Sequence, residues 1–172
     1  MTHRLALDVA GPMVAAPLLL LGLLWPLAPA FAQGQRDIGN PAHVQCVGKN
    51  RLTGATEKPI ESYGDPPGRA YAVIYFHPAH GTAHIIYGPR YRTIAPLMQS
   101  FITRHECQHA NGVQDEIAAN CKALTQMRGL GLTAEQEEQI GRWHGAEGTI
   151  DPRYGGSGAA FWQLTLRCAG GR

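Results

Sequence analysis

One stretch, His105-Glu106-Cys107-Gln108-His109, constrains the fold of this chain more than any other. In an α-helix, residues four positions apart lie on one face, so a helix here places the imidazoles of His105 and His109 side by side. Glu106 then lies about 100° around the helix from His105, close to that face but not on it. The stretch therefore predicts a helix that offers two histidines to one metal ion, with a carboxylate beside them.

The pattern H-E-x-x-H is the sequence form of a zinc peptidase site, and the chemistry requires these residue types at this spacing. Two neutral imidazoles are good zinc ligands, and a neighbouring carboxylate can take a proton from a zinc-activated water. We therefore expect His105 and His109 to bind Zn²⁺ and Glu106 to act as the general base. The expected reaction is hydrolysis of a peptide bond in a peptide or protein substrate.

For a third metal ligand the sequence offers two adjacent acids, Asp115 and Glu116. With Asp115, the string from His105 through Gly112 to Asp115 resembles the extended metzincin motif in its snapalysin-like form, in which Asp replaces the last His. With Glu116, the pair Glu116 and Asn120 resembles the gluzincin pattern E-x-x-x-D, in which the Glu binds zinc and the Asp supports a ligand histidine. Both acids are candidates on spacing alone.

The neighbourhood of the motif also resembles that of small secreted bacterial gluzincin-like proteins, which carry H-E-C-x-H followed by E-x-x-A-D-C. Residues 105–109 and 116–121 follow this pattern, including both cysteines and Ala119. Asn120 stands where the family has Asp, and its amide oxygen can still accept a hydrogen bond from an imidazole without adding charge. The resemblance implies a zincin-like fold, Asn120 behind a ligand histidine, and the zinc ligands His105, His109 and Glu116.

The first 32 residues have the pattern of a signal peptide. Arg4 supplies a short positive region, residues 14–27 are almost wholly apolar, and Ala30-Phe31-Ala32 matches the small-x-small pattern of a cleavage site. A membrane anchor is the alternative, but prolines interrupt an apolar run that is already short for a bilayer span. We expect cleavage after Ala32, a periplasmic or secreted protein, and no membrane attachment after cleavage.

Export changes the interpretation of the four cysteines, because in an oxidising compartment an even number favours disulfides over free thiols. Four cysteines allow three pairings, and the sequence leaves all three open for Cys46, Cys107, Cys121 and Cys168. Cys107 lies about 200° from His105 around the predicted helix, so it points away from the metal face. We expect Cys107 to have a structural role.

The 172-residue chain has the composition of one ordinary globular domain, with 44% hydrophobic and 16% charged residues. Its 15 basic and 13 acidic side chains are scattered without a basic run, so no nucleic-acid partner is expected. Residues 33–70 predict an irregular segment with a short strand at residues 44–47 and a loop at residues 59–68. Residues 71–172 are expected to form the zincin-like metal-binding domain.

Within that domain, β-branched and aromatic runs at residues 71–76 and 83–87 predict a β-hairpin. His77, His80 and His84 lie in or beside its turn without a carboxylate or thiol among them, which favours an exposed polar turn over a second metal site. Apolar periodicity and capping residues predict helices at residues 94–110, 114–128, 133–144 and 159–168. The predicted fold class is α+β, with a short antiparallel sheet packed on the active-site helix and two or three further helices.

Three functions follow from these patterns. The first is the zinc peptidase, in which the strand at residues 83–87 pairs with the substrate and His144 or Tyr154 stabilises the oxyanion. The second is a catalytically inactive zincin-like domain that binds a metal or a partner. The third is a small structural domain in which the three fixed residues of the motif occur by chance.

Overall fold

The computed structural model describes residues 38–170 of the chain. The expected signal peptide and its cleavage site, at residues 1–32, lie outside the described residues. Within residues 38–170, no helix combines the length and the apolar character needed to cross a membrane.

The four helices of the described region confirm the α+β prediction, and each begins at a capping residue or a proline. Pro96 occupies the first turn of α2, where its missing N–H costs no hydrogen bond. The predicted capping box is present at the start of α4, where Thr133 and Gln136 exchange hydrogen bonds. The helices are α2 (Pro96–Ala110), α3 (Glu116–Gly129), α4 (Ala134–Ala146) and α5 (Gly158–Cys168).

A three-stranded sheet has the order β3-β5-β4, with β3 (Ile60–Tyr63), β4 (Ala72–Phe76) and β5 (Ala83–Tyr87). β4 and β5 form the predicted antiparallel hairpin. β3 runs parallel to β5 on its other side, so β5 is the central strand. The predicted loop at residues 59–68 is therefore wrong for β3. All residues of β3 are exposed, so this strand lacks the alternation of apolar and polar residues that marks a strand in a sequence.

A second, smaller pair consists of β1 (Gly48–Lys49) and β2 (Thr56–Glu57), which are antiparallel. The strand predicted at residues 44–47 is wrong, because the chain is irregular there and the pairing begins at Gly48. The apolar residues of that stretch have another cause: Cys46 is buried and belongs to a disulfide.

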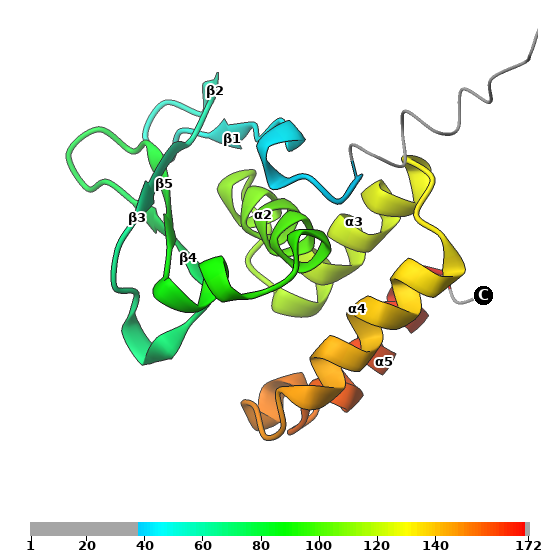
Figure 1. Cartoon of the computed structure of the whole chain (residues 1–172). Helices are drawn as coiled ribbons and strands as arrows, with labels where there is room; N and C mark the ends of the chain where they lie inside the picture. The colour runs from blue at the N-terminus through cyan, green and yellow to red at the C-terminus, as the bar shows by residue number, and fades with distance from the viewer. Residues whose placement is uncertain (1–37, 171–172) are drawn as a thin grey trace, which may run out of the picture.

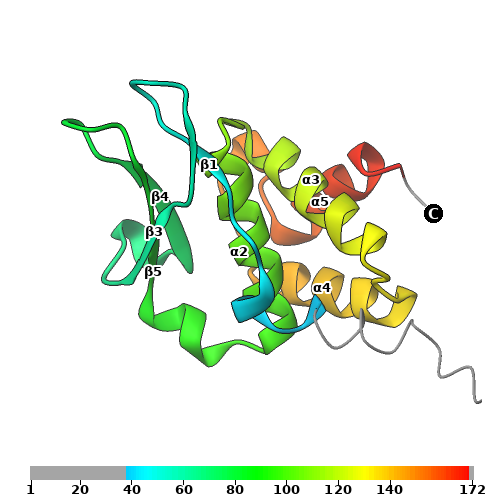
Figure 2. The same ribbon diagram turned by 90° about the horizontal axis from the view of Figure 1, so that it is seen from above.

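Helix α2 lies between the sheet and the other three helices (Figures 1 and 2). On the sheet side, Ile102, Cys107 and Ala110 join the core that contains Ile85 and Tyr87. On the other side, α2 joins a second core, formed with residues of α3, α4 and α5 and built around Leu97, Met98, Phe101, Leu124, Met127, Ile140 and Trp162. A helix packed on two sides has little freedom to shift, and this helix carries the H-E-x-x-H motif.

Two disulfides fasten this arrangement, Cys46–Cys107 and Cys121–Cys168. The first ties the segment before β1 to α2, and the second ties α3 to α5. Their Cα–Cα distances of 5.3 and 5.8 Å lie within the usual range for a disulfide. The structural role predicted for Cys107 is confirmed. Each crosslink closes a long loop and contributes on the order of 2–4 kcal/mol to stability.

Candidate metal centre

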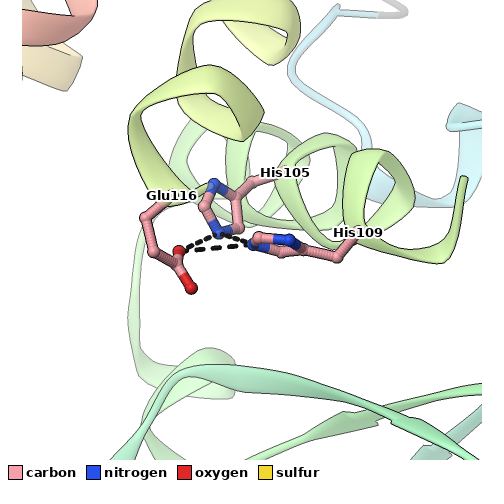
Figure 3. Close-up of side chains that lie close together, drawn as sticks. All are labelled: His105, His109 and Glu116. Carbon is pink, nitrogen blue, oxygen red and sulfur yellow. Dashed lines mark hydrogen bonds and ion pairs between the residues drawn. The ribbon is translucent and has the colours of Figure 1, made fainter. Parts of the chain in front are cut away.

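His105, His109 and Glu116 each place one ligand atom within 4.8 Å of the other two (Figure 3). The Nε2 atoms of the two histidines are 3.0 Å apart. Oε2 of Glu116 lies 2.9 Å from Nε2 of His105 and 3.3 Å from Nε2 of His109. The two histidines come from one face of α2, as their spacing predicts, and the glutamate comes from the first residue of α3.

A tight turn between the two helices brings Glu116 to the histidines. Asn111 ends α2, and Gly112 follows with a φ of 92°, a left-handed conformation that glycine adopts without strain. The N–H of Val113 then donates to the carbonyl of Gln108, which folds the chain back along α2. The short connection from His109 to Glu116 is therefore compatible with two separate helices.

The adjacent acid, Asp115, has a different position. It is the N-cap of α3, and its Oδ1 accepts a hydrogen bond of 2.7 Å from the N–H of Ala118. Its carboxylate is thus used at the start of the helix, whereas that of Glu116 faces the imidazoles. Of the two acids that the sequence left open, the structure brings Glu116 to the histidines.

Hydrogen bonds behind the histidines orient both rings. Nδ1 of His109 lies 2.6 Å from the carbonyl oxygen of Val113, and Nδ1 of His105 lies 2.7 Å from Oδ1 of Asn120. A carbonyl oxygen only accepts, so each Nδ1 carries the proton. The Nε2 atoms that meet at the centre therefore present lone pairs, which is the tautomer that binds a metal.

The amide of Asn120 is itself oriented by a neighbouring hydroxyl. The hydroxyl of Thr165 donates to the carbonyl of Phe161, so it accepts from the Nδ2 of Asn120, at 3.4 Å. This leaves Oδ1 of Asn120 facing His105. Asn120 is 2% exposed. Its contact with Nδ1 of His105 gives it the supporting position that the family resemblance implied.

The three converging atoms fit a zinc ion. Two ligands of a tetrahedral zinc, each about 2.0–2.1 Å from the metal, are separated by about 3.3 Å. The observed separations of 2.9, 3.0 and 3.3 Å are close to this value. Two imidazoles and one carboxylate also form the ligand set of catalytic zinc sites that keep a fourth position open.

The electrostatics show that this centre favours a positive charge. Burial opposes ionisation of Glu116, but the hydrogen bonds from His105 and His109 outweigh it and hold the pKa of Glu116 below its usual value. Burial likewise lowers the pKa of His109, but hydrogen bonds to Glu116 and Val113 raise it above the usual value. The charges of these groups therefore favour a cation between the two imidazoles and the carboxylate.

Glu106 is buried beside the histidines, with 6% of its surface exposed. Burial raises the pKa of its carboxyl, against the opposing effect of the charges on His105 and His109. A carboxylate whose proton affinity is raised in this way is suited to accept and return a proton near neutral pH.

The centre opens into a cleft of about 750 Å³. One wall is strand β4, with residues from Ala72 to Phe76, and the opposite wall contains α2 with His105, Glu106 and His109. Aromatic side chains from α2, α4 and α5 also line the cleft: Phe101, Trp143 and Phe161. The cleft thus combines an apolar surface with one polar centre, as ligand sites commonly do.

The other residues named from the sequence have separate positions. His144 lies in the cleft wall and is 6% exposed, with its ring stacked on Trp162 at 5.2 Å. Burial lowers the pKa of His144 to about 3, so the ring is neutral at ordinary pH. Tyr154 is not among the described residues that line the cleft, and it packs against Phe161 at 5.6 Å.

The expected role of the strand at residues 83–87 is wrong. This strand is β5, and both of its edges are paired, one with β3 and one with β4. β3 and β4 each have an unpaired edge within the described sheet, and of these two strands β4 lines the cleft. Val113 also belongs to the site but was not predicted, because it contributes a backbone carbonyl, which leaves no signal in the residue type.

Comparison of the chain with protein families, with curated proteins and with solved structures finds no match. The function must therefore be inferred from the chemistry of the site itself.

Proposed function

We propose that this protein is a periplasmic or secreted zinc-dependent metallopeptidase, with His105, His109 and Glu116 as zinc ligands and Glu106 as the general base. The observation that carries the proposal is the convergence of three lone-pair atoms within 2.9–3.3 Å of one another. Both ring protons are committed elsewhere, so a cation stabilises this arrangement.

Zinc at this centre would supply Lewis-acid activation of a water molecule and of the substrate carbonyl. Glu106 accepts the proton of the attacking water and delivers it to the leaving amine, in line with the raised pKa of its carboxyl. Asn120 and the carbonyl of Val113 keep the two imidazoles in the ligand tautomer throughout.

The proposed substrate is an extended peptide segment. The unpaired edge of β4 offers backbone groups for antiparallel or parallel pairing, and the strand borders the metal centre. The apolar lining, including Ile74, Phe76 and Trp143, suits apolar side chains on that peptide. His144, in the cleft wall, is the better placed of the two candidates for stabilising the oxyanion.

Two observations support the proposed compartment. Both disulfides link segments far apart in the sequence, and such crosslinks persist in oxidising compartments. The residues before Gln33 also have the composition of a signal peptide.

The decisive experiment compares Glu106→Gln with the parent protein in chelator-sensitive cleavage of a mixed peptide library. We expect the variant to retain zinc and to lose cleavage by roughly 100-fold or more, since general-base catalysis contributes at least that factor. Glu138→Gln is the matched control, because Glu138 is exposed on α4 and pairs with Arg142. Cleavage at the parental rate by Glu106→Gln would rule out the proposed base.

A second candidate function is a zincin-like domain that binds zinc without cleaving peptides. Asn120 favours it, because an amide adds no negative charge to raise the basicity of His105. Stoichiometric zinc in a parent protein that cleaves no member of the library would support this alternative. Absence of stoichiometric zinc, or a zinc content that does not fall in His105→Ala, would instead indicate that the motif is accidental.

A further inference from the structure

Three other histidines meet at the tip of the β4–β5 hairpin. His77 follows β4, His80 lies in the turn, and His84 belongs to β5. The ring centroids are 3.7 Å apart for His77 and His80, 6.0 Å for His77 and His84, and 6.1 Å for His80 and His84. We call these three residues the hairpin histidine cluster.

The backbone of the hairpin holds the cluster together. In the register of the two strands Tyr75 lies opposite His84, so both point to one face of the sheet. His77, two residues after Tyr75, points to the same face. A side chain from outside the hairpin also holds the turn, because Nδ2 of Asn50 donates a hydrogen bond to the carbonyl of His80 at 2.8 Å.

The hairpin histidine cluster offers imidazole nitrogens with no carboxylate beside them in the hairpin. Residues 77–84 contain no acidic side chain. Desolvation and the charges of the neighbouring histidines lower the pKa of His77. Nδ1 of His80 lies 3.1 Å from the hydroxyl of Thr82, which can accept its proton and leave Nε2 as a lone pair.

His84 supplies the observation that points to a ligand. Its Nε2 is buried and makes no hydrogen bond within the described part of the chain. A buried polar atom without a partner costs about 1–3 kcal/mol, and such an atom calls for an explanation when it lies beside two further imidazoles. An exposed polar turn, the expectation from the sequence, does not account for it.

We propose that His77, His80 and His84 form a second metal site, separate from the His105 centre, for a borderline transition-metal ion. Neutral imidazoles suit Cu²⁺, Ni²⁺ and Zn²⁺, and affinity for such a site is highest for Cu²⁺. An ion here satisfies the unpartnered nitrogen of His84 and draws the other two rings around it. The proposal does not depend on peptidase activity.

The three rings must move to bind one ion, because His77, His80 and His84 do not bring their ligand atoms within 4.8 Å of one another. Two imidazoles on one tetrahedral ion have ring centroids about 5 Å apart, and the rings of His105 and His109 are 4.6 Å apart. In the hairpin cluster, two separations exceed this value by roughly 1 Å and the stacked pair is closer by a similar amount. His80 is exposed, so its side chain can slide off His77 at little cost.

The test is titration of the mature protein with Cu²⁺ and with Zn²⁺, with bound metal counted after removal of the free ion. We expect two equivalents in the parent and one in His77→Gln/His80→Gln, whose substituted side chains leave the buried face of the sheet unchanged. His43→Gln, at an exposed histidine outside the cluster, is the matched control and should keep two. The double variant His105→Ala/His109→Ala should keep one equivalent, with a Cu²⁺ electron paramagnetic resonance spectrum of coordinated imidazole nitrogens.

Two results would overturn the second site. One is a parent protein that binds a single equivalent, lost in His105→Ala/His109→Ala. The other is a second equivalent that survives in His77→Gln/His80→Gln. Either result leaves the peptidase proposal intact, and failure of the Glu106 experiment leaves the hairpin site intact, so the two proposals are tested separately.

Discussion

Replacing Asn120 with leucine should weaken zinc binding while leaving all three proposed ligands in place. Oδ1 of Asn120 accepts the Nδ1 proton of His105 at 2.7 Å, and this bond holds both the tautomer and the plane of the ring. Leucine has the same number and branching of side-chain heavy atoms but no acceptor. The buried N–H of His105 would lose its partner, and the ring would no longer be held with Nε2 toward the centre.

The expected loss of zinc affinity follows from the position of Asn120 behind His105, a proposed ligand. Loss of a group that hydrogen-bonds a metal-binding histidine costs about 10- to 100-fold in metal affinity, or roughly 1.4–2.7 kcal/mol. The second bond of Asn120, to Thr165, is long at 3.4 Å and so contributes little more. Asn120→Asp should instead raise zinc affinity, because a carboxylate raises the basicity of the imidazole.

The assay is competition for zinc against a chromophoric chelator, with urea unfolding of the zinc-free proteins as a check on the fold. Gln126→Leu likewise replaces an amide side chain with leucine, at an exposed position of α3, and should bind zinc as the parent does. Parental zinc affinity in Asn120→Leu would refute the supporting role of Asn120. So would an equal loss in Gln126→Leu.

Three further predictions concern acid stability, the helix cap and a disulfide. The pKa of His144 is about 3 in the folded protein and near 6.5 when unfolded, so stability falls as pH drops from 6.5 toward 3, by up to about 1.4 kcal/mol per pH unit. In His144→Gln, urea unfolding over this range should show a shallower decline, and parallel declines would contradict the assignment. Asp115→Ala should keep zinc and lose about 1 kcal/mol of stability with the N-cap, whereas loss of zinc would make Asp115 a ligand. Cys46→Ser/Cys107→Ser should lose on the order of 2–4 kcal/mol and unfold at lower temperature; an unchanged midpoint under oxidising conditions would contradict a stabilising crosslink.

The features that the sequence predicted well depend on residues close together in the chain. The helices follow from apolar periodicity and capping residues, and the β4–β5 hairpin follows from two apolar runs joined by a short turn. The approach of His105 to His109 needs only one helical turn.

The features that were missed depend on contacts between distant segments. β3 joins β5 in parallel, and its exposed residues carry no apolar pattern that reveals the pairing. Because β3 pairs with one edge of β5 and β4 with the other, β5 is the central strand, and the unpaired edge at the cleft belongs to β4. The sequence left the pairing of the cysteines open for the same reason. Cys46 and Cys107, for example, are separated by 61 residues.

The choice between the adjacent acids Asp115 and Glu116 was left open on spacing alone, but the residue preference at a helix N-cap distinguishes them. Asp115 has the extended backbone of an N-cap, with φ −84° and ψ 127°, and aspartate is among the residues preferred there. Its short side chain reaches the N–H of Ala118 and is occupied by it. Glu116 is the first helical residue and has a longer side chain, with no cap to form. In an Asp-Glu pair at the start of a helix, the cap therefore takes the first acid and leaves the second for the histidines.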